Sequence, residues 1–140
     1  MNIIYAMSKS QKDVAADIEQ GTRQLIRHLT KLWFMPDAQE VPHWRKEVAE
    51  KLCSVDSFKG SHKYPSAEFI LDHSWRLHRS RLDYFVKTTM LGFGQHCKLS
   101  DSPELLTQID KYFDWIAHVL SKYRDVTYEL IYKKLAELGF

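Results

Sequence analysis

The feature that most constrains this fold is a helical spacing of apolar residues that runs through most of the 140-residue chain. Apolar side chains recur every three or four positions, and only four prolines and five glycines interrupt the pattern. This spacing collects apolar residues on one face of an α-helix, whereas no segment alternates as a half-buried strand would. We therefore predict an all-α fold, an antiparallel bundle of four or five helices. Residues 1–140 are expected to form a single helical domain, with residues 1–8 flexible.

Helix-start and helix-stop residues divide the chain into predicted helices. Ser10 and Pro42 suit helix starts, Pro36 ends the first helix, and the glycines after Leu91 end the third. Gly21 lies inside the first helix, where it costs stability relative to alanine, so we expect close packing of another helix there. The predicted helices span residues 10–34, 42–53, 66–91 and 102–138, and a break in the last at Arg124–Thr127 is left open.

The third predicted helix has two apolar faces. One stripe suits the core of the bundle, and it consists of Leu71, Trp75, His78, Leu82, Phe85, Val86 and Phe93. A second line follows at seven-residue steps, and it consists of Ile70, Leu77, Tyr84 and Leu91. A helix that is apolar on two faces is buried on two sides. The second line is therefore either covered within the bundle or a binding surface for another protein or a second copy of the chain.

Two histidines lie within apolar stripes, His28 on the first helix and His78 on the third. A histidine in this position is usually a packed residue whose ring nitrogens are hydrogen-bonded. Inward histidines on different helices can also bind a metal, but such sites add carboxylates or further histidines. Only Glu68 and Asp72 lie near the edge of the third-helix stripe, and no HExxH pattern is present. We therefore predict no metal site.

Arg23 and His28 form an Arg-x4-His pattern, with the polar Gln24 directly after the arginine. This spacing resembles the motif of small helical RNases of the HEPN type. The resemblance implies a histidine that acts as acid or base and an arginine that holds the phosphate. In that family the motif usually lies late in the domain, at a dimer cleft, whereas here it lies early.

Basic residues gather in two places. Arg23, Arg27 and Lys31 recur at four-residue steps opposite the apolar stripe of the first helix, and Arg76, Arg79 and Arg81 surround His78. Both groups can bind phosphates of a nucleic acid. The alternative is a solvated helix face, because the acids Glu19 and Asp83 lie nearby in the sequence.

The remaining composition excludes several classes of protein. The formal net charge of +2 is too small to indicate a nucleic-acid-binding domain by itself. Cys53 and Cys97 show no metal or redox spacing, so we expect free thiols and a cytoplasmic location. No apolar run is long enough to span a membrane, so no membrane partner is expected. No nucleotide-binding loop or nucleophile motif is present, so we predict no cofactor.

The segment HLTKLWFMPDAQEVPHWRKEV resembles a bacterial helical domain family of unknown function, common in cyanobacteria. In that family a helix ends with His-Leu-x-Lys, and a proline and a Trp-Arg pair follow. The residues that match are His28, Leu29, Lys31, Pro36, Trp44 and Arg45. The resemblance covers about a seventh of the chain and implies a helical fold in which His28 packs between helices. It implies no activity.

These observations favour a non-enzymatic protein-binding domain over an enzyme. A bacterial accessory or immunity-type protein, which blocks a toxin or a nuclease, has this size. The line of Ile70, Leu77, Tyr84 and Leu91 is the predicted partner-binding surface. The alternative is a nucleic-acid-acting protein, such as a HEPN-like RNase that uses Arg23 and His28.

Overall fold

The computed structural model describes the backbone of residues 9–56, 67–122 and 126–140 and the side chains of residues 15–52, 71–119 and 126–140. The expectation that residues 1–8 are flexible concerns a part of the chain outside these ranges. The described chain contains α-helices and one short 3-10 turn, and no strand occurs in it. The elements are α1 (Lys9–Phe34), α2 (Val41–Asp56), α3 (Ala67–Arg79), α4 (Leu82–Leu91), the 3-10 turn η2 (Leu99–Asp101), α5 (Glu104–Lys122) and α6 (Tyr128–Leu138).

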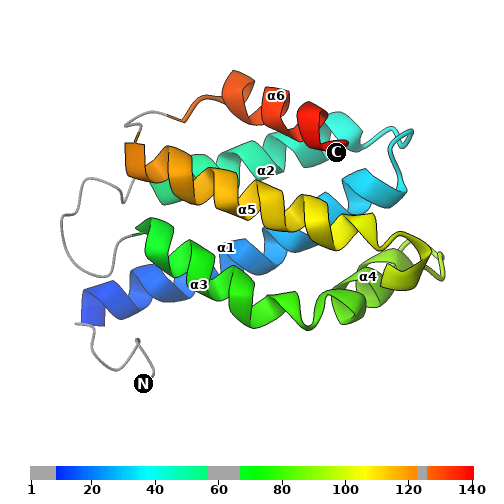
Figure 1. Ribbon diagram of the computed structural model, residues 1–140, viewed down its shortest axis with the longest axis horizontal. Helices are drawn as coiled ribbons and strands as arrows, with labels where there is room; N and C mark the ends of the chain where they lie inside the picture. The colour runs from blue at the N-terminus through cyan, green and yellow to red at the C-terminus, as the bar shows by residue number, and fades with distance from the viewer. Residues whose placement is uncertain (1–8, 57–66, 123–125) are drawn as a thin grey trace.

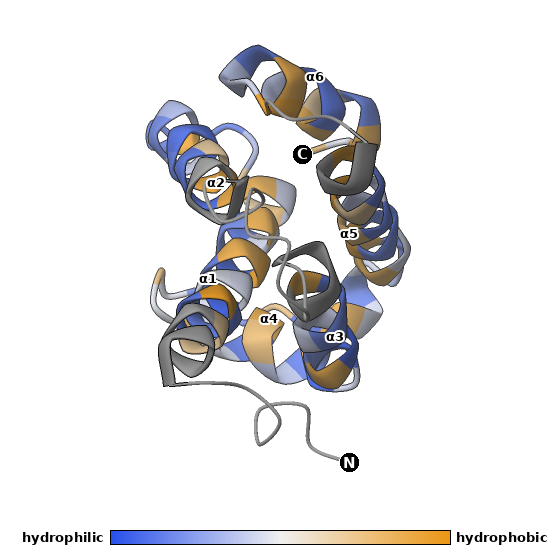
Figure 2. Cartoon of the chain, turned by 90° about the vertical axis from the view of Figure 1, so that its left-hand side faces the viewer, coloured by the Kyte–Doolittle hydropathy of each residue, from blue (hydrophilic) through white to orange (hydrophobic). Residues whose placement is uncertain are grey.

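The helices form an all-α bundle, as predicted, in which the long helices that follow one another in the chain run antiparallel (Figure 1). α1 contacts α2, α3, α4 and α5, so it is the central helix of the bundle. The apolar faces of the helices point toward one another across the interior (Figure 2). The large side chains that are fully buried there include Ile18, Leu25, Ile26, Leu29, Leu32, Leu52, Leu71, Trp75, Leu82, Met90, Tyr112 and Phe113.

The predicted single helix over residues 66–91 is wrong, because the chain bends between α3 and α4 (Figure 1). Arg81 precedes α4 with φ −104° and ψ 13°, outside regular helix geometry, and its N–H donates to the carbonyl oxygen of His78 at 2.9 Å. No proline or glycine lies at this bend. Packing explains it, because α4 contacts α1 and η2 and buries Leu82 and Val86. The bend therefore comes from tertiary contacts.

α5 and α6 are separate helices, so the break left open near residues 124–127 exists. The cap of α6 is Thr127, whose side chain accepts a hydrogen bond from the N–H of Leu130 at 3.2 Å. Asp125, the cap considered from the sequence, lies outside the described residues. α6 ends at Leu138 and is capped by Gly139, which has φ +89°. The N–H of Phe140 then donates to the carbonyl oxygen of Leu135 at 2.8 Å.

Gly21 does not mark a close helix contact. A Cβ atom added to it would meet no other group within 4 Å, so the expectation of close packing there is wrong. No described helix has the length and apolar character needed to cross a membrane.

Candidate interaction surface

His28 lies at the contact between α1 and α2. Its Nδ1 donates to the carbonyl oxygen of Gln24 at 2.7 Å, and its Nε2 contacts one carboxylate oxygen of Glu47. The other oxygen of Glu47 lies 2.8 Å from His43 Nε2. The His28 side chain is only 12% exposed, and both of its ring nitrogens have partners within the fold. This is the arrangement expected of a histidine that holds two helices together.

Lys31 lies one turn further along α1, between two aromatic rings. Its ammonium group is 5.7 Å from the ring centroid of Trp44 and 5.6 Å from that of Phe93. The two rings also meet edge to face, with centroids 5.7 Å apart. Burial lowers the pKa of Lys31, the nearby Glu47 opposes this shift, and Arg27 adds to it. His28, Lys31 and Trp44 therefore join α1 to α2.

The structure does not bring Arg23 and His28 together. Five residues along a helix correspond to a rotation of about 140°, so the two side chains leave α1 in different directions. Arg23 bonds Glu19 at 2.9 Å, and its Nε donates to His78 Nε2 at 3.5 Å, whereas His28 faces α2. The phosphate-binding arginine and the acid–base histidine of an RNase site are thus not assembled within one chain.

His78 lies on α3, is buried and contacts Arg23 of α1, whereas His28 contacts Glu47 of α2. Its Nδ1 has no hydrogen-bond partner among the residues that the structure describes. Burial lowers the pKa of His78, as does the positive charge of Arg23, while Glu19 opposes the shift and Arg81 adds to it. The two histidines do not face each other. The described residues contain no group of three histidine, cysteine or acidic side chains that could bind a metal.

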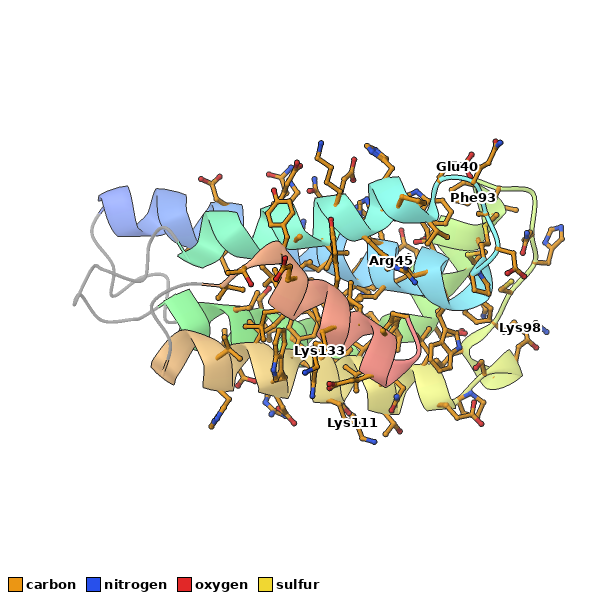
Figure 3. All side chains as sticks on the ribbon, turned by 90° about the horizontal axis from the view of Figure 1, so that it is seen from above. Glu40, Arg45, Phe93, Lys98, Lys111 and Lys133 are labelled. Atoms are coloured by element: carbon orange, nitrogen blue, oxygen red, sulfur yellow. The ribbon has the colours of Figure 1, made fainter. Side chains whose placement is uncertain are left out.

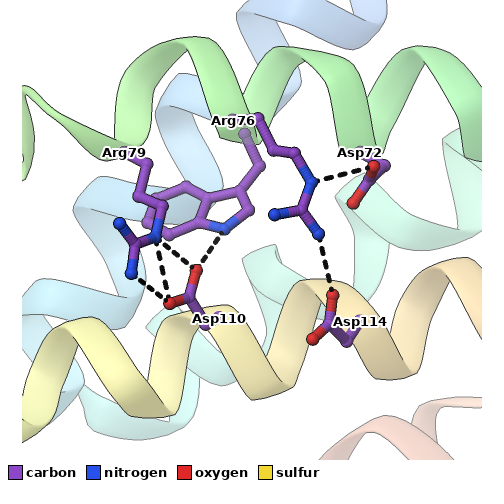
Figure 4. Close-up of polar contacts among 6 residues, drawn as sticks. Asp72, Arg76, Arg79, Asp110 and Asp114 are labelled. Carbon is purple, nitrogen blue, oxygen red and sulfur yellow. Dashed lines mark hydrogen bonds and ion pairs between the residues drawn. The ribbon is translucent and has the colours of Figure 1, made fainter.

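Arg76 and Arg79 connect α3 to α5 and are paired with aspartates (Figure 4). Arg79 bonds both carboxylate oxygens of Asp110, at 2.9 to 3.0 Å. Arg76 lies 3.2 Å from Asp72 and 3.4 Å from Asp114. Their charges are thus compensated within the bundle. These two arginines, which the sequence predicted as phosphate ligands, join α3 to α5 through these ion pairs.

Large apolar side chains remain exposed on α3, on α4 and just after α4. The exposed fractions are 57% for Leu77, 53% for Tyr84, 58% for Leu91 and 42% for Phe93. We call these four residues the α3–α4 surface. Three of them belong to the predicted line, while Ile70 lies outside the residues whose side chains are described. Phe93 (labelled in Figure 3), assigned from the sequence to the buried stripe, is exposed, because α4 has ended before it at Gly92. Its ring meets that of Trp44 edge to face.

Two arginines border this surface without an acidic partner. The Arg81 guanidinium lies 5.2 Å from the Tyr84 ring centroid, and that of Arg27 lies 5.6 Å from the Phe85 ring centroid. The Tyr84 and Phe85 rings meet edge to face at 6.0 Å, so the two arginines flank a continuous aromatic pair. Neither arginine forms an ion pair with any described residue. Nothing in the sequence indicated that Arg27 on α1 and Arg81 before α4 would lie over neighbouring rings.

An apolar crevice lies on the other side of the bundle, among Leu52, Trp115, Val119 and Val126. It is too narrow to admit a water molecule, so it does not suggest a ligand site.

Comparison of the chain with protein-family models, with curated proteins and with solved structures gave no match.

Proposed function

We propose that this chain is a non-enzymatic protein-binding domain whose α3–α4 surface recognises another protein. The observation that carries the proposal is the exposure of Leu77, Tyr84, Leu91 and Phe93 on adjoining elements. Monomeric proteins seldom expose large contiguous apolar patches, and those that do often use them to bind partners. Aromatic residues such as Tyr84 and Phe93 are also enriched in the centres of protein interfaces.

The contacts of the polar candidates support a binding domain over an enzyme. Arg23 and His28 serve different helix contacts, and Arg76 and Arg79 are compensated by aspartates. A role as a bacterial accessory or immunity-type protein, which occludes a toxin or nuclease, fits a binding domain of this size and remains part of the proposal. A cytoplasmic location is part of it too.

A pull-down from the native host tests the proposal. The tagged wild type is compared with a Leu77→Glu, Tyr84→Glu variant, and recovered protein and RNA are both identified. Because both side chains are more than half exposed, the variant is expected to keep the circular dichroism spectrum of the wild type. We expect a protein partner that the wild type captures and the variant loses.

A control variant carries the same added charge elsewhere. Thr107→Glu on α5 and Ala136→Glu on α6 also change exposed residues, and this control should retain the partner. Recovery of RNA in place of protein would favour the nucleic-acid alternative. Equal recovery of the partner by all three proteins would contradict the proposed surface. A wild type that sediments as a dimer, with a monomeric α3–α4 variant, would identify a second copy as the partner.

A further inference from the structure

The charges that border the α3–α4 surface indicate which kind of partner it fits. Arg81 lies over Tyr84, and Arg27 lies over the Phe85 ring that adjoins Tyr84. A partner carboxylate that reached Tyr84 would therefore meet the Arg81 guanidinium, and one that reached the adjoining Phe85 ring would meet that of Arg27. Each guanidinium can bind a carboxylate through parallel N–H donors, which is the geometry that arginine favours with carboxylates.

The arginines and the lysine of α3 and α4 differ from Arg27 and Arg81, because each has an acidic partner. Arg76 is bound by Asp72 and Asp114, Arg79 by Asp110, and Lys87 lies 2.7 Å from Asp83. Arg27 and Arg81 have no such acidic partner in the described part of the chain. These two uncompensated charges, one on α1 and one in the turn between α3 and α4, lie over the Phe85 and Tyr84 rings and thus beside the exposed apolar residues.

Lys31 extends this positive border to the other end of the surface. Its ammonium group lies over the ring of Phe93, which is itself part of the surface. Glu47 is near enough to oppose the lowering of the Lys31 pKa, but that carboxylate is already shared between His28 and His43. Cations thus lie at both Tyr84 and Phe93, with the aliphatic Leu91 between them in the sequence.

From this arrangement we infer that the α3–α4 surface binds an acidic, amphipathic segment of a partner protein, in which leucine-like residues are flanked by Asp or Glu. The inference rests on the proposed function and adds the chemistry of the partner. The aliphatic partner residues would cover Leu77, Tyr84 and Leu91, while the carboxylates would pair with Arg27 and Arg81. Opposite charges at such a border mainly set specificity and the rate of association.

A second copy of the chain is a poorer occupant. In a two-fold dimer the same patch faces itself, so Arg27 and Arg81 of each copy would border those of the other. A nucleic acid also fits less well, because its strands carry no aliphatic groups that match Leu77 and Leu91. Single-stranded nucleic acids instead bind where aromatic rings stack on bases along a charged groove.

A phage-displayed library of random peptides, each of about 16 residues or about four helical turns, tests the inference without assuming a sequence. The library is selected on the wild-type protein. We expect enrichment of peptides with a negative net charge and apolar residues at helical spacing. Their binding should weaken by about tenfold or more on an Arg27→Glu, Arg81→Glu variant, and it should also weaken as salt is raised.

The matched control is Lys111→Glu, Lys133→Glu, which makes the same change in net charge at exposed positions of α5 and α6 (Figure 3). It should bind the enriched peptides as the wild type does. A Tyr84→Ala, Leu91→Ala variant separates this inference from the proposed function. Enriched peptides that lose binding to that variant but are uncharged or basic would overturn the inference and leave the protein-binding proposal standing.

Other outcomes would contradict the α3–α4 surface itself or assign it a different class of partner. Peptides that bind all variants equally, or a selection that enriches nothing, would contradict both the acidic partner and the α3–α4 surface. Binding of a single-stranded RNA oligonucleotide that is lost in the Arg27→Glu, Arg81→Glu variant and retained in the control would replace the acidic segment with a nucleic acid. Reversible dimerisation of the wild type that is lost in the Tyr84→Ala, Leu91→Ala variant would replace it with a second copy.

Discussion

Arg79 of α3 and Asp110 of α5 form a two-pronged ion pair across the bundle. The guanidinium Nε lies 3.0 Å from each carboxylate oxygen, and Nη2 lies 2.9 Å from Oδ2. Asp110 also accepts a hydrogen bond from the indole of Trp75 at 2.9 Å. Burial by itself raises the pKa of Asp110, but the hydrogen bonds from Arg79 and Trp75 outweigh it and hold that pKa below its usual value. One carboxylate thus fixes two residues of α3 on α5.

Replacement of Asp110 by Ala should therefore destabilise the protein by about 1–3 kcal/mol, because the buried Trp75 loses its acceptor. Asp114→Ala is the matched control on the same helix. Asp114 is 65% exposed and lies 3.4 Å from Arg76, so its loss should cost less than about 0.5 kcal/mol. Urea unfolding of both variants measures the difference. Equal losses would show that the bonds of Asp110 to Arg79 and Trp75 stabilise the protein no more than an exposed ion pair does.

His28→Ala and Trp33→Ala should both lower thermal stability. His28 joins α1 to Glu47 of α2, while Trp33 packs on Phe140 with ring centroids 5.5 Å apart and donates to the Ser102 hydroxyl at 2.7 Å. Loss of such packed side chains costs about 2–5 kcal/mol. Thermal unfolding followed by circular dichroism tests both variants.

Trp33→Phe serves as the control, because it keeps one aromatic ring at this position while it removes the indole donor and part of the ring volume. It should cost less than Trp33→Ala. Melting temperatures of His28→Ala and Trp33→Ala that match the wild type would show that neither residue holds α1 to its neighbours.

Gly21→Ala should stabilise the protein. The added methyl group meets nothing within 4 Å, and alanine is favoured over glycine inside a helix by about 0.8–1 kcal/mol. Gly139→Ala is the opposite case, because Gly139 has φ +89° and an added Cβ atom would lie 3.3 Å from the Trp33 ring. Chemical denaturation should place the two variants on opposite sides of the wild type. A destabilised Gly21→Ala would mean that α1 is not a regular helix there.

His78 should make the protein less stable as the pH falls below neutrality. Burial and the charge of Arg23 lower its pKa in the fold, Glu19 opposes the shift, and Arg81 adds to it. The unfolded chain therefore takes up the proton first, below about pH 6.5, so it binds more protons than the folded chain. The stability lost in this way grows until the pH falls through the lowered pKa of folded His78.

Replacement of His78 by Gln removes this titration. The variant should show a flatter dependence of unfolding free energy on pH between about pH 7 and pH 5. The lowered pKa values of Asp83 and Asp110 act only at a more acidic pH, near about 4, so they do not interfere. An identical slope for wild type and variant would assign the loss of stability to other groups.

Tyr112→Phe should leave stability unchanged or raise it by up to about 1 kcal/mol. The side chain is fully buried, and its hydroxyl has no partner among the described residues. Burial raises the pKa of Tyr112 well above its usual value, so the hydroxyl keeps its proton in the core. A buried polar group without a partner costs free energy, which the phenylalanine avoids. Calorimetry that shows a loss larger than about 1 kcal/mol would reveal a bonded hydroxyl.

The sequence by itself determined the all-α fold, the position of the first two helices and most of the core. The first helix was predicted at residues 10–34 and lies at Lys9–Phe34, and the stripe residues Leu25, Leu29 and Leu32 are buried. These features follow from the sequence because helix periodicity and end signals act within a few residues of one another. The same local signals indicated that Leu77, Tyr84 and Leu91 lie off the buried stripe, without showing whether another helix covers them.

Only the tertiary structure decided the bend at Arg81, the exposure of the α3–α4 surface and the partner of each charged residue. Arg79 and Arg81 are two residues apart, yet one faces Asp110 on α5 and the other lies over Tyr84 with no acidic partner among the described residues. Arg23 and His28 share a helix but contact α3 and α2, respectively. The physical reason is that the group opposite a side chain belongs to a distant part of the sequence. It is brought there by the packing of whole helices, which local spacing does not encode.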